Sequence, residues 1–478
     1  MHDSWDSRPS LAGLLAGVAV GVYLLVIAGA TAAIADAAAA CGAWPLCGGA
    51  SPTDPSVAVA LGHRAVAAVV GLLLVGTVAV AWARNAPRRV RAALAGAALL
   101  YPVQIAVGAL AAVKAVPPTL AGTHLAVGVT IFVGVALALA WQLEAETADG
   151  DDPLAATGVT TVADPPEVAA TPAEDDAAVG GSPADAAGSA GLLATARAYV
   201  RLTKPRLMWL LCLVAAAAMA LAAGPALSAR TVGYTLLGGV LAIGASGTFN
   251  HVLERDVDRR MQRTADRPLA TDQVGVRNAV GFGVVLSAAA VASFLQVNAL
   301  AAGLGLVAIL FYSVVYTLVL KPHTVQNTVI GGFAGSLPAL IGWAAVTGRV
   351  GVPAVVLAGL IFLWTPAHFY NLAMAHREDY ARGGFPMLPV VHGPAVARRH
   401  VLLYLVATMV AAAALAAVSR LGVLYAGTAV VLGTGFLWAV LRLHRERTEA
   451  AAMRAFHASN AFLGGLLVVV VLDALLLA

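Results

Sequence analysis

The chain has few charged residues and very little lysine. Only 11% of its 478 residues are charged, 60% are hydrophobic and the mean hydropathy is +0.85, whereas about a quarter of the residues in ordinary soluble domains are charged. This composition excludes a soluble globular protein. The formal net charge is only +4, and basic residues that flank apolar runs are explained by the positive-inside rule. Charge therefore gives no argument for binding nucleic acid.

We also expect no cleavable signal peptide. The first nine residues carry little positive charge, and the apolar run that follows, residues 10–33, is long enough to span a bilayer. Cysteine occurs three times. Cys212 lies inside an apolar run, where we expect inert core. Cys41 and Cys47 flank a short loop and either form a disulfide or remain thiols, with the disulfide favoured if the loop lies outside the cell.

Long apolar runs fill the rest of the chain. They are rich in Ala, Val, Leu and Gly, and each is close to the length of a membrane-spanning helix. The runs cover residues 10–33, 57–83, 92–113, 120–142, 206–224, 231–252, 277–297, 299–320, 325–347, 352–372, 400–418, 420–441 and 456–477. They predict an all-α polytopic membrane protein of about 13 transmembrane helices, a four-helix bundle followed by a nine-helix bundle.

An acidic segment separates the two groups of runs. Eleven of the 25 acidic residues fall between Glu144 and Asp185, and residues 143–195 contain no basic residue. This predicts a disordered linker between a domain of residues 1–142 and one of residues 196–478. Arginine-rich loops then predict that the N-terminus and the linker lie in the cytoplasm and the C-terminus outside.

One loop of the second domain combines acids with arginines. Asn250, Glu254 and Asp258 are spaced i, i+4 and i+8, which on a continuous helix stacks three oxygen-bearing side chains on one face. Such a face suits Mg²⁺ held jointly with a diphosphate. Guanidinium groups that bind phosphate oxygens follow at Arg260, Arg263 and Arg267. The alternative is an ordinary solvated loop.

A second loop has the same character. Arg377, Glu378, Asp379 and Arg382 follow another apolar run, and the alternation of spans brings both loops to the cytoplasmic face. Two such loops on one face favour a diphosphate site over two unrelated solvated loops. Aromatic and histidine side chains in the nearby spans either line a substrate pocket or pack between helices, namely Tyr312, Tyr316, His368, Phe369 and Tyr370.

These motifs resemble a known family. The pattern N-x-x-x-E-R-D-x-D-x-x-M-x-R-T-x-x-R-P-L runs from Asn250 to Leu269, R-E-D-Y-A-R-G-G-F-P-M-L-P from Arg377 to Pro389, and T-x-x-N-x-x-I-G-G-x-x-G-x-x-P from Thr324 to Pro338. They resemble the membrane-embedded UbiA-type prenyltransferases, and among them the protohaem IX farnesyltransferase (haem O synthase) family. The second acidic motif of the wider superfamily is D-x-x-x-D, whereas His376 and Tyr380 occupy the outer positions here.

The resemblance implies a nine-helix prenyltransferase that joins farnesyl diphosphate to protohaem IX in the membrane, using Mg²⁺. It implies catalytic roles for Asn250, Glu254, Asp258, Arg263, Arg267, Arg377, Glu378 and Asp379. The Mg²⁺ ligands would be Asn250, Glu254, Asp258 and Asp379. Membrane lipid and proteins of haem A synthesis or terminal oxidase assembly are the expected partners, and nucleic acid is not.

The first domain carries a pair of histidines at matched depth. His63 and His124 begin the second and fourth runs, so both fall in the outer half of the membrane and suggest bis-histidine binding of haem. C-x-x-W-P-x-C at 41–47, H-R at 63–64, Q-x-x-x-G at 104–108 and T-H-L at 123–125 resemble one four-helix half of haem A synthase. The acid that this family carries three positions before the first histidine is Ala60 here.

Two other readings of the whole chain remain open. One is prenyl transfer to a quinone or lipid acceptor, which the second motif disfavours. The other is a transporter or haem-carrying redox subunit in which the acidic clusters only flank helices. Sequence leaves the isoprenoid length, the oligomeric state and any oxidation of haem O by the first domain undecided.

Overall fold

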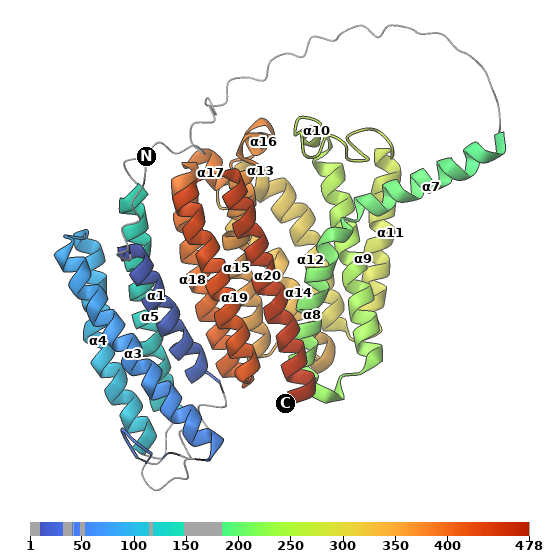
Figure 1. Ribbon diagram of the computed structural model, residues 1–478. Coiled ribbons are helices and arrows are strands. Elements are labelled where there is room, and N and C mark those ends of the chain that lie inside the picture. Colours follow the sequence, from blue (N-terminus) through green and yellow to red (C-terminus); the bar gives the residue numbers. More distant parts are fainter. Residues whose placement is uncertain are drawn as a thin grey trace.

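The fold consists of two adjoining helical bundles (Figure 1). The computed structural model describes residues 10–31, 41, 43–47, 53–113, 118–147 and 184–477. Thirteen helices within these residues are long and apolar enough to cross a bilayer. This confirms the predicted all-α polytopic class and its number of spans.

The first bundle contains four helices. They are α1 (Leu11–Gly29), α3 (Pro55–Ala83), α4 (Arg88–Val113) and α5 (Pro118–Thr147). Side chains cap the N-termini of two of these helices. The Ser10 hydroxyl accepts the Gly13 N–H at the start of α1. At the start of α3 the carboxylate of Asp54, the residue before Pro55, accepts the Ser56 N–H. Cys41 and Cys47 form a disulfide at the end of the bundle where α3 begins.

The second bundle carries nine spans. They are α8 (Pro205–Ala223) with η1 (Gly224–Ala226), α9 (Ala229–Leu253), α11 (Val276–Leu295), α12 (Ala299–Leu310) continued by the π-helix η2 (Phe311–Leu320), α14 (Asn327–Thr347), α15 (Val352–Ala375), α18 (Gly393–Ser419), α19 (Val423–Glu446) and α20 (Glu449–Leu472) with η3 (Asp473–Leu477). Short helices lie near one end of this bundle: α10 (Arg255–Asp258), α13 (Lys321–His323), α16 (Arg377–Arg382) and α17 (Leu388–Val391). The end of α20 lies at the opposite end (Figure 1).

The acidic linker is shorter than predicted. α5 continues to Thr147, and α7 (Ala184–Leu202) begins well before residue 195. Residues 143–147 and 184–195 are therefore helical, because their alanine and leucine content supports helix despite the neighbouring acids. Residues 148–183, where the rest of the predicted linker falls, lie outside the described residues.

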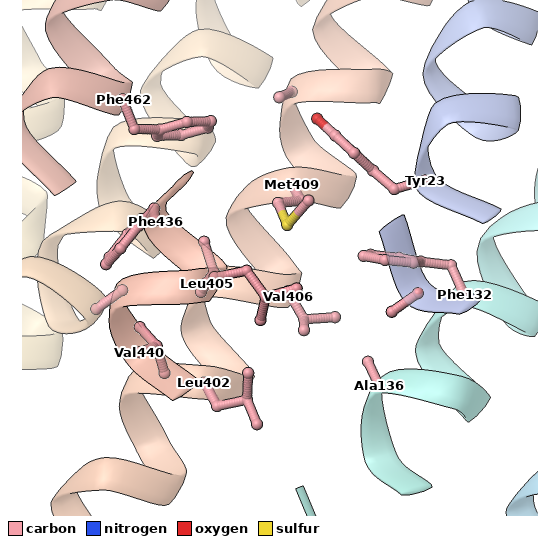
Figure 2. Close-up of a cluster of buried hydrophobic side chains, with 14 of the residues drawn as sticks. Tyr23, Phe132, Ala136, Leu402, Leu405, Val406, Met409, Phe436, Val440 and Phe462 are labelled. Carbon is pink, nitrogen blue, oxygen red and sulfur yellow. The ribbon is translucent and has the colours of Figure 1, made fainter. Parts of the chain in front are cut away.

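The two bundles share one apolar core. Helices α1 and α5 pack against α18 and α19, so Tyr23 and Phe132 face Val406 and Met409 (Figure 2). Tyr23 is completely buried in this contact. Glu144 adds a polar link near the end of α5, with ion pairs of 2.9 Å to Arg89 and 3.2 Å to Arg399. The first bundle is thus packed onto the second through apolar side chains and one ion pair.

Candidate functional site

The first acidic motif begins in the last turn of α9. Asn250 lies in that turn, Glu254 follows the helix end with φ −99° and ψ 4°, and Asp258 ends the short helix α10. The predicted continuous helical face is therefore wrong, because the helix breaks at Glu254. The three side chains are nevertheless buried together, each at most 5% exposed. Backbone bonds of 2.9 and 2.7 Å, from Glu254 to Asn250 and from Asp258 to Glu254, preserve the i, i+4 spacing.

Cations surround the two buried carboxylates. Lys321 Nζ lies 2.5 Å from Glu254 Oε1. Arg267 Nη1 lies 2.8 Å from both oxygens of Asp258 and 3.8 Å from Glu254 Oε2. One guanidinium therefore contacts both acids, which places the two carboxylates around a single shared position.

Asn250 connects the motif to two other helices. Its amide oxygen accepts a hydrogen bond from Lys204, and its amide nitrogen donates to Thr317 Oγ1 at 3.2 Å. Thr317 lies in the π-helix η2, and its hydroxyl donates to the Tyr312 carbonyl at 2.8 Å. π-Helical segments often occur at functional sites, and here the segment points a hydroxyl at the motif.

Burial and charge oppose each other at these groups. Burial raises the pKa of Glu254, but Lys321, Lys204 and Arg267 lower it more, so this pKa falls below its usual value. Burial outweighs Arg267 at Asp258 and raises the pKa of that carboxyl. Burial lowers the pKa of Lys204 to about 7, with Arg267 adding to the effect. The site thus holds the cations Lys204, Lys321 and Arg267 close together and away from water. A bound anion would reduce the repulsion between them.

The second acidic motif holds the loop after α10. Asp379 Oδ1 accepts the Gln262 N–H at 2.7 Å, and Oδ2 accepts the Arg263 N–H at 3.2 Å. Arg382 lies 3.0 Å from the same carboxylate, and Arg263 lies over the ring of Tyr380. The two motifs therefore meet, through contacts from a carboxylate to backbone N–H groups.

Asp379, the metal ligand expected in the second motif, is held by hydrogen bonds and an ion pair in the structure. Burial raises the pKa of Asp379, but hydrogen bonds from Arg382 and from the Gln262 and Arg263 N–H groups lower it more. Glu378 is exposed on α16, and Arg377 begins that helix. Within the described part of the chain, no group of three or more His, Cys, Asp or Glu side chains could hold a metal ion. A metal role for Asp379 stays a prediction.

An apolar cavity of about 260 Å³ opens beside this charged cluster. Lys204 belongs to both, because its ammonium reaches Asn250 while its side chain lines the cavity. Helices α8, α9 and α14 supply small side chains to the wall, and Tyr312, Tyr316 and Phe369 line it as well. A charged cluster next to an apolar cavity fits an amphiphile with an anionic head and a hydrocarbon tail.

His368 and Tyr370 have packing contacts instead. His368 is stacked between Trp364 and Phe456, with ring centroids 4.3 Å away on each side, and its Nδ1 lies 2.6 Å from Ser459 Oγ. Tyr370 meets Tyr404 edge to face. These contacts join α15 to α20 and α18, so the two residues support the bundle.

A second cavity, of about 390 Å³, lies inside the first bundle. His63 and His124 both line it, and the Nδ1 atoms of both rings are buried without a hydrogen-bond partner. Gln104 lies 3.3 Å from His124 Nε2. Arg64 also lines the cavity and donates to the carbonyl of Pro45 at 2.8 Å, which holds the disulfide loop at its mouth. The structure therefore brings the two predicted histidines to one cavity.

Sequence analysis missed the lysines that pair with the first motif. Lys204 and Lys321 are 117 residues apart, and only the folded chain brings both to Asn250 and Glu254. Their rarity was the available signal, because the chain has only three lysines and two of them are here. Thr317 carried no signal, since nothing in its sequence neighbourhood marks a π-helix.

The sequence of this chain is similar to those of known membrane prenyltransferases. Residues 210–466 match the UbiA prenyltransferase family. Protoheme IX farnesyltransferase 1 of Natronomonas pharaonis is 59% identical over 97% of this chain and 98% of its own. Protoheme IX farnesyltransferase of Haloarcula marismortui is 59% identical over 99% of this chain and all of its own.

One solved structure resembles the fold of a large part of this chain. It is described as giving insights into digeranylgeranylglyceryl phosphate synthase in membranes, and it covers 59% of this chain and 98% of its own with a TM-score of 0.50. At 15% sequence identity, this likeness concerns the fold alone.

Proposed function

This chain belongs to the UbiA prenyltransferase family, and on that premise we propose that it farnesylates protohaem IX. Farnesyl diphosphate loses its diphosphate, the allylic carbon bonds to a vinyl group of protohaem IX, and water adds to complete the hydroxyethylfarnesyl side chain of haem O. The observation that carries the proposal is 59% identity, over nearly the full length, to two relatives named for this reaction. The charged cluster beside the apolar cavity supports it independently.

The difficult step is breaking the allylic C–O bond, because negative charge develops on the leaving diphosphate. Lys204, Lys321 and Arg267 are positioned before the substrate arrives, next to the cavity that would hold its tail. Preorganised cations in a water-poor site stabilise such charge well. The cavity wall would keep bulk water from the allylic cation until the acceptor has reacted.

Mg²⁺ fits the donor set of the first motif. Glu254 and Asp258 are buried carboxylates that already share one cation, Arg267, and Asn250 adds an amide oxygen. Hard oxygen donors of this kind, completed by phosphate oxygens, are the usual surroundings of Mg²⁺. When bound there, the ion would neutralise charge on the diphosphate. Arg263, Arg377, Glu378 and Asp379 form or brace the neighbouring loops, and their catalytic roles remain part of the proposal.

The protein is a multi-pass membrane protein, and we infer its orientation from charge. The loops with α10, α13 and α16 lie at one end of the second bundle (Figure 1), and the arginines near them favour the cytoplasm. A cytoplasmic site suits a diphosphate substrate made in water. The C-terminus then lies outside, and the disulfide of Cys41 and Cys47 lies in the oxidising compartment.

The first bundle supports a second proposal, haem binding. Two histidines with unpartnered ring nitrogens line one cavity, whose volume falls within the range of cofactor sites. His63 and His124 would supply the axial ligands. Ala60 also lines this cavity, in the place of the acid expected for haem oxidation, so we propose haem holding and leave oxidation out. Protein partners in haem A synthesis or oxidase assembly remain a prediction.

The deciding experiment is a reaction with purified protein in detergent. Mg²⁺, protohaem IX and farnesyl diphosphate are supplied, and the mass of the extracted haem is measured by mass spectrometry. A product heavier by one farnesyl group plus water is expected. Diphosphate release only with a quinone or lipid acceptor would instead assign the chain to another reaction of the family, and absence of any release would favour a transporter or redox subunit.

A further inference from the structure

We propose that Phe294 is the floor of the prenyl cavity and limits the length of the isoprenoid chain that the protein accepts. The proposal rests on the proposed function, since it concerns the tail of the same substrate. It assigns the specificity for farnesyl over longer chains to one ring at the far end of the cavity, opposite the charged cluster.

The cavity runs along the helices from the charged cluster into the membrane. Near the cluster its wall includes Gly247 at the end of α9, and deep in the bundle it includes Thr235 near the start of α9. These two residues are twelve positions apart, which corresponds to about 18 Å at the helical rise. Phe294, in the last turn of α11, lies at this deep end because α11 runs antiparallel to α9.

Phe294 is held in place by its neighbours. The ring is completely buried. A Cβ added at Gly238 would lie 2.8 Å from the ring, and one at Gly305 would lie 2.5 Å from it, so glycine is required on both sides. The adjacent Ser293 hydroxyl donates to the Tyr234 carbonyl at 2.9 Å, which ties the end of α11 to the start of α9. The ring is therefore clamped between α9 and α12, where close packing opposes its displacement by a longer tail.

The rest of the described deep wall carries small or aliphatic side chains, the largest being Leu236 and Ile341. Gly239 and Ala242 leave room for a hydrocarbon chain along α9. Helices α8 and α14 approach so closely at Ala215 and Gly342 that a side chain at Gly342 would strike the Ala215 backbone. The remaining aromatic residues of the described lining, Tyr312, Tyr316 and Phe369, come from the ends of their helices nearer the charged cluster. Among the described lining residues, Phe294 is thus the aromatic side chain at the deep end.

Removing the ring should deepen the cavity by the space of a phenyl group. A tail longer by one isoprene unit then gains apolar burial where it previously met the ring. Phe294→Leu should open the floor in part and Phe294→Ala more fully. Phe311→Ala is the matched control, because Phe311 packs against Phe333 outside the cavity lining.

The test measures binding of tails without any acceptor. Non-hydrolysable farnesyl and geranylgeranyl thiodiphosphates are each added during alkylation of Cys212, a free thiol in the cavity wall. The concentration of each compound that protects the thiol is measured. In the native protein the farnesyl compound should protect at lower concentration. In Phe294→Ala and Phe294→Leu the ratio of protecting concentrations should shift towards geranylgeranyl by about tenfold, a size expected for apolar pocket changes.

An unchanged ratio in both Phe294 variants, measured on protein that still binds the farnesyl compound, would overturn the proposal. So would an equal shift in Phe311→Ala. The parallel assay with protohaem IX separates this inference from the proposed function. A shifted ratio with no farnesylated haem from the native protein would uphold the length limit and reject the acceptor.

Discussion

Lys321 and Glu254 form a buried ion pair, with 2.5 Å between Nζ and Oε1. Both side chains are largely shielded from solvent, at 13% and 6% exposure. Asp258 and Arg267 form a second pair beside it, and Arg267 reaches Glu254 as well. Each acid is thus held beside a cation in a place where an incoming diphosphate would compete for the same cations.

Removing the ammonium of Lys321 should disable the reaction. In Lys321→Met, Glu254 loses its nearest partner and the leaving diphosphate loses a cation, so kcat/KM for farnesyl diphosphate should fall by about a hundredfold. Lys321→Arg should recover part of this loss. Steady-state diphosphate release is the measurement. Arg349→Met, an exposed change in the turn after α14, is the control, and an equal loss there would remove the argument.

The pairing of Lys321 with Glu254 should also appear in a double-mutant cycle. Lys321→Met and Glu254→Gln each remove one member of the pair, so their combined effect on kcat/KM should be smaller than the product of the two single effects. Independent, multiplicative losses would show that the two residues act separately in catalysis.

Asp258 should control the requirement for Mg²⁺. Asp258→Asn keeps the shape of the side chain and removes its charge, so the Mg²⁺ concentration at half-maximal rate should rise by about tenfold or more, and EDTA should abolish activity of the native protein. Asp256→Asn is a matched control two residues away, because the Asp256 side chain is 87% exposed. Identical Mg²⁺ curves for Asp258→Asn and the native protein would reject the metal assignment.

Cys212 should report occupation of the cavity. It is the chain's one cysteine outside the Cys41–Cys47 disulfide, and it lines the cavity. Farnesyl thiodiphosphate should slow its alkylation by N-ethylmaleimide by about tenfold, because the tail covers the thiol. Pyrophosphate, which has the head without the tail, should protect little. Labelling followed by mass spectrometry gives the rate, and equal rates with and without the farnesyl compound would place the tail elsewhere.

The two histidines of the first bundle should bind haem together. Loading the native protein with haem should give a low-spin spectrum, and His63→Ala or His124→Ala should lose it because each removes one axial ligand. His392→Ala, an exposed histidine of the second bundle, should retain it. Farnesylation should continue in the His63 and His124 variants. A low-spin spectrum that survives the double variant would exclude this ligand pair.

Much of the architecture follows from local composition. Apolar runs of bilayer length predicted thirteen spans, and the structure confirms them, because backbone groups in lipid must be satisfied within each helix. The family also followed from sequence, since the motifs from Asn250 to Leu269 and from Arg377 to Pro389 lie in short contiguous stretches, and the similarity to known prenyltransferases confirms it. The roles of individual site residues stay predictions.

Contacts between distant segments depended on the tertiary structure. The sequence could not show that both oxygens of Asp379 accept the N–H groups of Gln262 and Arg263. The spacing of Asn250, Glu254 and Asp258 predicted one continuous helical face, whereas the helix breaks at Glu254. Local periodicity does not encode the side-chain partners that Glu254 meets where the helix ends, such as Lys321.

Sequence by itself thus determined the membrane class, the helices and the chemical character of the site, because each depends on residues close together in the chain. Only the tertiary structure decided which cations neutralise the buried acids and how deep the cavity beside them runs. Lys204 meets Asn250 across 46 positions, and Phe294 is clamped by Gly238 and Gly305 from two other helices. Such relationships depend on how the helices pack, and packing is a property of the whole bundle.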